Sequence, residues 1–361
     1  MTPDSAYDLT VITVCMNVLP DVQRSVESVL AQKALGSLKI EHLIVDGAST
    51  DGTPEWLAEA KAAGRIEAYI SEKDGGIYPA MNKGIELARG RVLAFLNAGD
   101  RYAEQDLAPL VRPISEGRVA ASCGAALCHT VEGSQWVYRP TMLRAWWDQL
   151  GCHQAYFASA EAYHAVHGYD AAGFRSAADC QMMNDIMRAF GAPLMQDDVV
   201  VHFEEGGFST GFWKVYRHEI IEIHARAWDK LSERCREDAD FRRMMAAMLA
   251  WHCLEVIQMT PEKRRKAAPQ IEKLVRMCRE IPGICGALRL ALNACVGFVK
   301  RAMKHDKPVA KWQWALFQLP HFICAVPHAN PYKRVYIGPS KKQIAAMFPK
   351  RLAAALRGGK R

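Results

Sequence analysis

The sequence predicts an α/β protein with a mostly parallel sheet flanked by helices, followed by a basic helical C-terminal region. In the first hundred residues, short apolar segments rich in β-branched residues alternate with amphipathic segments. This alternation is typical of βαβ units, whose parallel strands are covered on both faces. Residues 1–205 contain 16 Lys and Arg against 27 Asp and Glu, whereas residues 206–361 contain 30 against 12. Because electrostatic fields act regionally, the two parts are expected to have different partners.

The elements of the α/β part follow from hydrophobic periodicity. Apolar runs predict strands at residues 9–15, 40–46, 66–71 and 91–97. The segments between them predict helices at residues 21–32, 54–63 and 79–88. Pro54 and Pro79 suit a first helical turn, which needs no amide donor there, and Thr53 is expected to cap the second helix.

The periodicity is weaker from residue 103 to 150, where we expect strands at the margin of the sheet and assign no packing to Trp146 and Trp147. A helix at residues 179–190 and a strand at 197–203 then complete the α/β part. We therefore predict an α/β domain at residues 1–210 and a basic α-helical region at residues 211–361.

Composition narrows the class of protein. The eleven cysteines are odd in number and form no Cys-x-x-Cys pair, which disfavours a disulfide scaffold and zinc fingers. No basic region precedes the first apolar run, so we expect a cytoplasmic protein without a signal peptide.

The basic region contains apolar stretches at residues 244–259, 281–299 and 312–326. The middle stretch approaches the length of a membrane span but contains Pro282, Arg289 and Asn293, so a helix lying in a membrane interface is favoured. Clusters such as KRRK at 263–266 and the final RGGKR favour contact with anionic lipid, although a solvated helical bundle is an alternative. Nucleic acid is not expected, because no recognisable binding motif accompanies the basic residues.

Small polar or acidic residues follow each of the four predicted strands. They are Asn17, then Asp46 and Asp51, then Glu72 and Asp74, then Asn97 and Asp100. Ligands of open parallel sheets bind outside the carboxyl ends of the strands. The sequence lacks GxGxxG and GxxxxGK[ST], the glycine cradles of dinucleotide and P-loop sites. A divalent cation held by carboxylates, bridging the phosphates of a nucleotide, is the favoured alternative.

Six segments in order resemble the family-2 inverting nucleotide-sugar glycosyltransferases, whose fold is the Rossmann-like GT-A type. They are TVCMN with SVLAQ, IEHLIVDGASTDGT, SEKDGGIYPAMNKGIELARGRVLAFLNAGD, CHQAYF, GYD with AAD at 177–179, and HFEEGGFS. The resemblance covers approximately residues 9–210. It implies transfer of a sugar from a nucleotide diphosphate, with UDP expected, to an acceptor hydroxyl, with Mn²⁺ or Mg²⁺ as cofactor.

The resemblance also implies roles for individual residues. The nucleotide-sugar would contact Asn17, Asp46, Asp74, Lys83 and Asn97. Asp100 stands where such enzymes have their Asp-x-Asp-type metal motif, His202 is a further candidate metal ligand, Asp179 occupies the place of the catalytic base, and His153 would line the acceptor site. The expected acceptor is a cell-surface polysaccharide, a lipopolysaccharide or a lipid-linked glycan at the cytoplasmic face of the membrane.

Structural roles compete with each of these assignments. Asp179 precedes an apparent helix and could be its N-cap, while Asp46 and Asp100 could be turn residues. His153 and His202 could be hydrogen-bonded structural histidines. Glu204 and Glu205 could be solvated, or could belong to a loop hinged at Gly206 and Gly207 that closes over the donor. For the whole chain, the alternative function is a non-catalytic module that binds a nucleotide or glycan and recruits partners through its basic tail.

Overall fold

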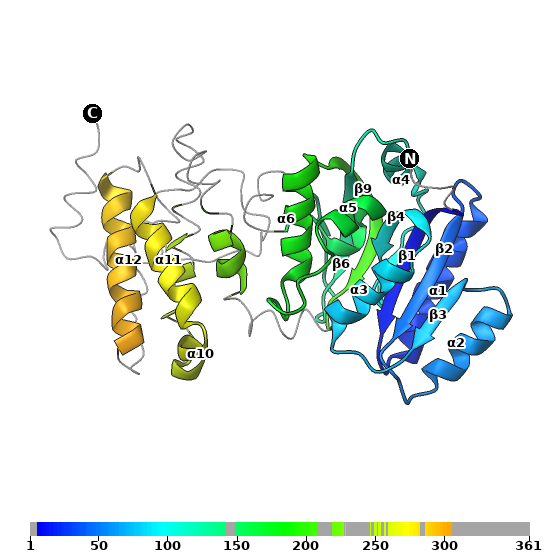
Figure 1. The fold of residues 1–361 in the computed structure, drawn as a ribbon, viewed down its shortest axis with the longest axis horizontal. Helices are drawn as coiled ribbons and strands as arrows, with labels where there is room; N and C mark the ends of the chain where they lie inside the picture. Colours follow the sequence, from blue (N-terminus) through cyan, green and yellow to red (C-terminus); the bar gives the residue numbers. More distant parts are fainter. Residues whose placement is uncertain are drawn as a thin grey trace. The chain divides into compact units, whose positions relative to one another are not determined.

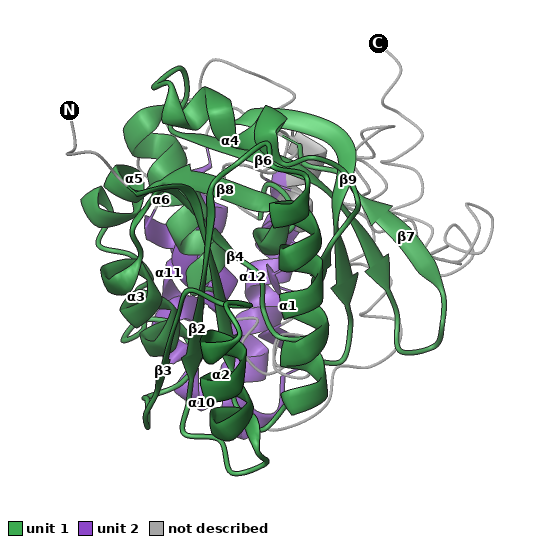
Figure 2. Ribbon diagram, turned by 90° about the vertical axis from the view of Figure 1, so that its right-hand side faces the viewer, with its two compact units in different colours: residues 1–216 green, residues 217–361 purple. Residues whose placement is uncertain are grey.

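The computed structural model describes residues 6–141, 149–207, 219–226, 259–281 and 286–304, together with residues 228, 246, 249, 250, 252, 253, 256 and 257. The chain divides into two compact units, residues 1–216 and 217–361 (Figure 2). Trp146, Trp147, the stretch at 312–326 and the final RGGKR lie outside the described residues.

The first unit begins with the predicted βαβ units (Figure 1). The strands are β1 (Tyr7–Cys15), β2 (Ile40–Asp46), β3 (Ala68–Ser71) and β4 (Gly90–Phe95). The helices between them are α1 (Leu19–Ala34), α2 (Thr53–Ala62) and α3 (Ile77–Leu87). These strands pair in parallel in the order β3-β2-β1-β4. The predicted parallel sheet is therefore confirmed.

The rest of the unit extends this sheet with mostly antiparallel pairings. Its strands are β5 (Arg101–Tyr102), β6 (Ala121–His129), β7 (Gln135–Tyr138), β8 (Tyr156–Ser159) and β9 (Leu194–Glu204). Its helices are α4 (Ala108–Ser115), α5 (Ala160–Ala165) and α6 (Ala178–Phe190), with a 3₁₀ turn at His153–Ala155. The order continues β4-β8-β6-β9-β5, and β7 pairs with β6.

The expectation that residues 103–150 supply strands only at the sheet margin is wrong. Strand β6 lies inside the sheet, antiparallel to β8 on one side and parallel to β9 on the other. Its sequence, ASCGAALCH, consists mainly of small residues with little β-strand preference. The small side chains permit close packing, since a Cβ on Gly124 would lie 2.5 Å from Val200 Cγ2.

Two buried clusters that share helix α1 cover one face of the sheet in the first unit. One buried cluster joins Val22 and Val26 of α1 to Ile44 of β2 and Leu57 of α2. The other cluster includes Val29, which continues the apolar face of α1. Three predicted positions on α1 are thus fully buried, so the helix is held by an amphipathic face.

The start of α2 differs from the expectation that Thr53 caps it. Gly52 occupies the N-cap with φ of 91°, and Thr53 is the first helical residue. Asp51 supplies the acceptor, because its Oδ1 receives hydrogen bonds from the amide (3.2 Å) and hydroxyl (2.6 Å) of Thr53. These hydrogen bonds lower the pKa of the Asp51 carboxyl.

The second unit contains α10 (Pro261–Lys266), α11 (Ala268–Glu280) and α12 (Gly286–Lys304). Arg289 of α12 fastens the end of α11, donating to the carbonyl oxygens of Cys278 (3.3 Å), Arg279 (3.0 Å) and Ile281. It thereby satisfies carbonyl groups that a helix end leaves without partners.

The apolar face of α12 is buried within the protein. Its buried side chains include Leu292, Cys295, Val296 and Val299. These residues therefore pack against protein, and any contact with lipid would use the exposed basic face. Within the described residues, no helix is long and apolar enough to cross a membrane.

The described cysteines are free thiols, and all eight are buried. Burial raises the pKa of the Cys123 thiol and that of Cys295, the latter to about 12. Neutral, buried thiols behave as small apolar side chains.

The close packing of β6 against β9 makes position 124 sensitive to added volume. We expect Gly124→Ala to lower the free energy of unfolding by about 1–3 kcal/mol, because the new methyl group would overlap Val200. Gly207→Ala is the matched control, since nothing lies within 4 Å of a Cβ there. Urea unfolding checks both variants, and equal stability of the two would contradict the packing argument.

Candidate active site

The carboxyl ends of β1, β2 and β3 meet around the side chain of Asp46, which is fully buried. Ser71, at the end of β3, donates to Asp46 Oδ2 at 2.6 Å, and the Ser49 amide donates to the same oxygen at 3.0 Å. The Ser49 hydroxyl and the Cys15 thiol donate to Oδ1, the thiol at 3.6 Å. Asp46 therefore orders the loop after β2, and its oxygens are engaged by the protein itself.

Asn17 follows β1 and is joined to the same loop. Its backbone has φ of 55°, a left-handed conformation that Asn tolerates better than most residues. Its backbone amide donates to Ser49 Oγ at 2.7 Å, while its side-chain Oδ1 accepts from the Thr50 backbone amide at 2.8 Å. The exposed Asn17 side chain and the buried Asp46 side chain thus both hold the loop at residues 47–50.

Asp74 lies close to the end of β2, although it follows β3. A Cβ on Gly47 would be 3.1 Å from Asp74 Oδ2, so a glycine at 47 leaves room for this carboxylate. Asp74 Oδ1 accepts from the Gly76 amide at 2.9 Å. Lys83 of α3 is engaged nearby in an ion pair of 2.6 Å with Glu72.

The turn after β4 is held by helix α1. The hydroxyl of Ser25 donates to the Asp100 carbonyl oxygen at 2.8 Å, and the Gly99 amide donates to Ser25 Oγ at 3.1 Å. Among the described residues, Asn97 Oδ1 is buried with no hydrogen-bond partner. A buried carbonyl oxygen of this kind needs a partner from outside the protein.

Asp100 is 4% exposed and accepts a 2.9 Å hydrogen bond from the Glu204 amide. The pKa of its carboxyl is raised to about 8, chiefly by burial; the charges of Glu204 and Asp21 act in the same direction, and that hydrogen bond opposes them. A neighbouring cation would relieve this unfavourable burial of negative charge.

His202 lies on β9, directly opposite Arg101 of β5. Its Nδ1 is 3.0 Å from Nε2 of His129, and the two rings stack with centroids 5.3 Å apart. Burial, followed by the charge of Arg101 and by His129, lowers the pKa of His202. A neutral imidazole can coordinate a metal, so this lowered pKa is compatible with His202 as a metal ligand.

Asp179 lies in the first turn of α6. The N-cap of this helix is Ala177, so the competing assignment of Asp179 as the N-cap is wrong. The Tyr78 hydroxyl donates to Asp179 Oδ1 at 3.3 Å, and the Gln149 amide group donates to Oδ2 at 2.8 Å. These two donors orient the carboxylate and connect it to α3.

His153 is 4% exposed and begins the 3₁₀ turn at residues 153–155. Its Nε2 is 2.8 Å from the Tyr169 hydroxyl, and its ring stacks on Phe95 with centroids 5.5 Å apart. Burial lowers the pKa of His153, against the opposing charge of Asp179. Tyr169 also stacks on Tyr78 at 5.6 Å, so His153 supports the aromatic side chains that position Asp179.

The structure thus brings the predicted residues together in two groups. Asn17, Asp46 and Asp74 meet at the ends of the first strands, and Asn97 shares a tight turn with Asp100. Sequence reasoning missed the partners that hold the candidate site residues: Ser25, Tyr78, His129, Gln149 and Tyr169. Of these partners, only Tyr78 had a sequence signal, because it lies in the segment GGIY directly after Asp74.

The donor set at the β4 turn has the chemistry of a hard cation site. Asp100 and Asn97 offer oxygen atoms of the kind that hard cations bind, and Mg²⁺ is commonly held by one or two carboxylates together with substrate phosphates. Across the described ranges, no three His, Cys, Asp or Glu side chains form a metal site by themselves. A cation held here could be completed by water molecules and by the oxygens of a bound phosphate.

Comparison with known proteins identifies the α/β part. Residues 10–181 match the model of glycosyl transferase family 2. An uncharacterised glycosyltransferase of Mycobacterium tuberculosis is 36% identical over 172 residues, which is 46% of this chain and 64% of that protein. The succinoglycan biosynthesis protein ExoO of Rhizobium meliloti is 33% identical over 97 residues, 27% of each chain.

Solved structures agree in fold. S. aureus TarS 1–349, in complex with UDP-GlcNAc, has a TM-score of 0.58 at 14% identity, covering 82% of this chain and 90% of that one. The mannosyltransferase PcManGT from Pyrobaculum calidifontis, in complex with GDP-Man and Mn²⁺, has a TM-score of 0.50 at 18% identity, covering 90% of this chain and 88% of that one. The expected GT-A fold is confirmed, and residues 10–181 are similar to glycosyl transferase family 2.

Proposed function

We propose that the chain is an inverting glycosyltransferase that moves a sugar from a nucleotide diphosphate to an acceptor hydroxyl. The observation that carries the proposal is the setting of Asp179, whose two oxygens accept from Tyr78 and Gln149. Inverting transfer needs a carboxylate that takes the acceptor proton as the oxygen attacks the anomeric carbon. Two donors from separate segments keep the Asp179 carboxylate in one orientation, as such a base requires.

The donor nucleotide would bind at the ends of β1 to β4. Asn17 and Asp46 would shape the nucleoside pocket through the loop at 47–50, since Asp46 is engaged inside the protein. Asp74, Lys83 and Asn97 would contact the base, the ribose or the diphosphate. The structural neighbours named above carry UDP-GlcNAc and GDP-Man, which supports a nucleotide-sugar donor, and we retain UDP as the expected nucleotide.

A divalent cation, Mn²⁺ or Mg²⁺, would be held by Asp100, with Asn97 as a neighbour and His202 as a further ligand. The buried Asn97 Oδ1 without a partner in the described structure, and the raised pKa of the Asp100 carboxyl, support this assignment. When bound, the cation supplies Lewis-acid stabilisation of the departing diphosphate. The mannosyltransferase neighbour is in complex with Mn²⁺.

The acceptor would be a hydroxyl of a cell-surface polysaccharide, a lipopolysaccharide or a lipid-linked glycan. The relationship to a succinoglycan biosynthesis protein supports this class. His153 would support the acceptor site indirectly, through Tyr169, because it contacts that residue and is almost fully buried. We place the reaction at the cytoplasmic face of the membrane, with the exposed basic face of the second unit on anionic lipid.

Asp179→Asn tests the proposed base. It should lower kcat by about 10²–10⁴-fold, because Asn cannot accept the acceptor proton, while donor binding stays within about twofold. The measurement combines turnover over a panel of nucleotide sugars with calorimetric binding of the donor found.

Asp185→Asn is the matched control, since Asp185 lies on the same helix and pairs with Arg188 and Gln181 away from Asp179. Unchanged turnover in Asp179→Asn would remove the proposed base. Donor binding without turnover by the unmodified chain would favour the alternative of a non-catalytic binding module.

Asp100→Asn tests the cation site. UDP or GDP should raise the Tm of the unmodified chain only when Mn²⁺ is present, because a ligand that binds the folded state stabilises it. Chelation by EDTA and the Asp100→Asn substitution should each abolish this rise. Asp197→Asn, an exposed carboxylate on β9, should retain it. An equal Mn²⁺-dependent rise in Asp100→Asn would contradict the assignment.

Vesicle flotation tests the proposed lipid contact. Replacing the exposed Lys263, Lys266 and Lys300 with Gln should weaken binding to phosphatidylserine vesicles by about 100-fold, since each basic residue contributes about 1 kcal/mol. The matched control replaces Lys39, Lys61 and Lys73, exposed in the first unit. Equal binding by both triple variants would refute this surface as the contact.

A further inference from the structure

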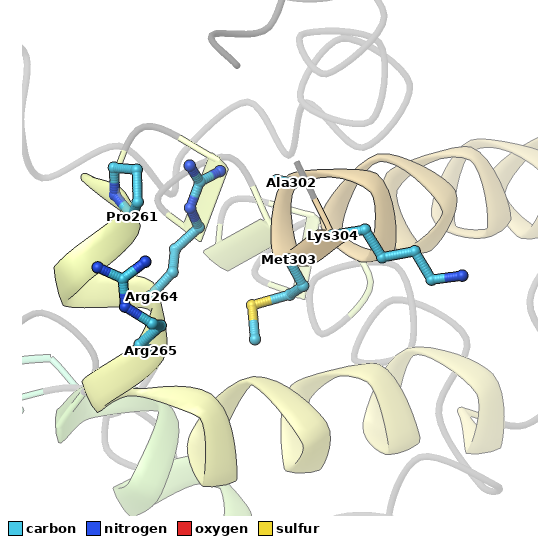
Figure 3. Close-up of a pocket in the computed structure, with 6 residues that line it drawn as sticks. All are labelled: Pro261, Arg264, Arg265, Ala302, Met303 and Lys304. Atoms are coloured by element: carbon cyan, nitrogen blue, oxygen red, sulfur yellow. The ribbon is translucent and has the colours of Figure 1, made fainter. Parts of the chain in front are cut away.

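A cavity in the second unit has properties that glycosyl transfer does not explain. It has a volume of about 230 Å³ and lies between α10 and the last turn of α12. The lining residues are Pro261, Arg264, Arg265, Ala302, Met303 and Lys304, none of them acidic (Figure 3). Both ends of the cavity therefore contribute basic residues, and no carboxylate is among the described residues that line it.

Arg264 is the unusual member of this cavity. It is 4% exposed, and its Nε and Nη1 are buried with no hydrogen-bond partner among the described residues. A guanidinium group remains charged at all ordinary pH values, so it cannot avoid the cost of burial by losing a proton. An unpaired buried charge costs several kcal/mol, which an anion in the cavity would offset.

The fold fixes Arg264 in this position. Thr260 caps α10 by accepting from the Lys263 amide at 3.4 Å, and the Arg264 amide donates to the Thr260 carbonyl oxygen at 3.0 Å. Pro261 occupies the first turn, and Ala267 is fully buried where α10 gives way to α11. The helix is thus anchored at both ends, with its fourth residue directed inward.

The charges around the cavity favour a compact anion. Arg265 lines it from the same helix, and Glu262, the acidic residue of α10, is exposed and pairs with Lys266 at 2.9 Å. In Figure 3 the ammonium group of Lys304 points away from the two arginines, so the guanidinium groups supply the principal contacts. Arginine forks match the geometry of phosphate oxygens and can donate two parallel hydrogen bonds.

We propose that this cavity is a binding site for a phosphate group, with Arg264 as its principal donor and Arg265 as a second. The group is either free phosphate or the phosphate of a lipid headgroup. This site differs from the exposed lysines of α10 and α12, because its principal donor, Arg264, is buried and lines a cavity. It also does not depend on the proposed transfer reaction.

Calorimetric titration of the full chain with inorganic phosphate, at constant ionic strength, tests the site. We expect saturable binding that Arg264→Gln weakens by about tenfold or more, as loss of charge-assisted hydrogen bonds requires. Arg279→Gln is the matched control, since Arg279 is exposed on α11 and does not line the cavity. It should bind phosphate as the unmodified chain does.

Two further variants distinguish loss of phosphate binding from a folding defect caused by substitution of the buried Arg264. Arg264→Lys keeps a charge but loses the planar fork, and should bind between the unmodified chain and Arg264→Gln. Arg265→Gln changes an exposed residue and should weaken binding several-fold with an unchanged Tm. Absence of saturable binding to the unmodified chain, or equal weakening by Arg279→Gln, would overturn the proposal.

Vesicles containing phosphatidic acid distinguish the two sources of the phosphate group. If Arg264→Gln lowers vesicle binding and free phosphate displaces the unmodified chain, the site accepts a headgroup. If Arg264→Gln changes phosphate binding and leaves vesicle binding unchanged, the site takes soluble phosphate. Either result supports the phosphate site. If Arg264→Gln retains both phosphate binding and vesicle binding, the proposal is wrong.

Discussion

The candidate site depends on one constraint: the carboxylate of Asp46 is buried at the end of an apolar strand and must be satisfied there. Donors from Cys15, Ser49 and Ser71 meet this need, and they come from the ends of β1 and β3 and from the loop after β2. A buried carboxylate without such donors would be strongly unfavourable. The same hydrogen bonds therefore stabilise the sheet edge and fix the loop that Asn17 joins.

The remaining parts of the site repeat this arrangement with other elements. Ser25 of α1 holds the turn after β4, and the Glu204 amide of β9 holds the Asp100 side chain. Tyr78 of α3 connects the third strand's loop to Asp179. The carboxylates of Asp46, Asp100 and Asp179 are thus each oriented by residues from other elements, so their orientation depends on the assembled sheet.

The sequence predicted the first half of the sheet because its signals are local. Strands such as β2 are apolar throughout and flanked by turn residues, and parallel strands place their carboxyl ends at one edge whatever the details of packing. Residues such as Asn17 and Asp100 could be located by that rule alone. Strand β6 could not, because a run of Ala, Gly and Cys carries no periodic pattern and its place is set by Val200 packing on Gly124.

The orienting partners were missed for a related reason. Tyr78 is 101 positions from Asp179 and Ser25 is 75 from Asp100, and no local spacing connects such pairs. The competing N-cap assignment for Asp179 failed because helix α6 begins earlier, at Ala178. The burial of His153 against Phe95 and Tyr169 likewise follows from tertiary packing, which local sequence patterns do not display.

The buried thiols have a practical consequence for studies of folding. Cys15, Cys123 and Cys152 belong to the first unit, while Cys253 and Cys278 belong to the second. A thiol reacts as the thiolate and only when reagent reaches it, so these positions are protected in the native state. Alkylation followed by peptide mapping would therefore record the opening of each unit separately, without any introduced label.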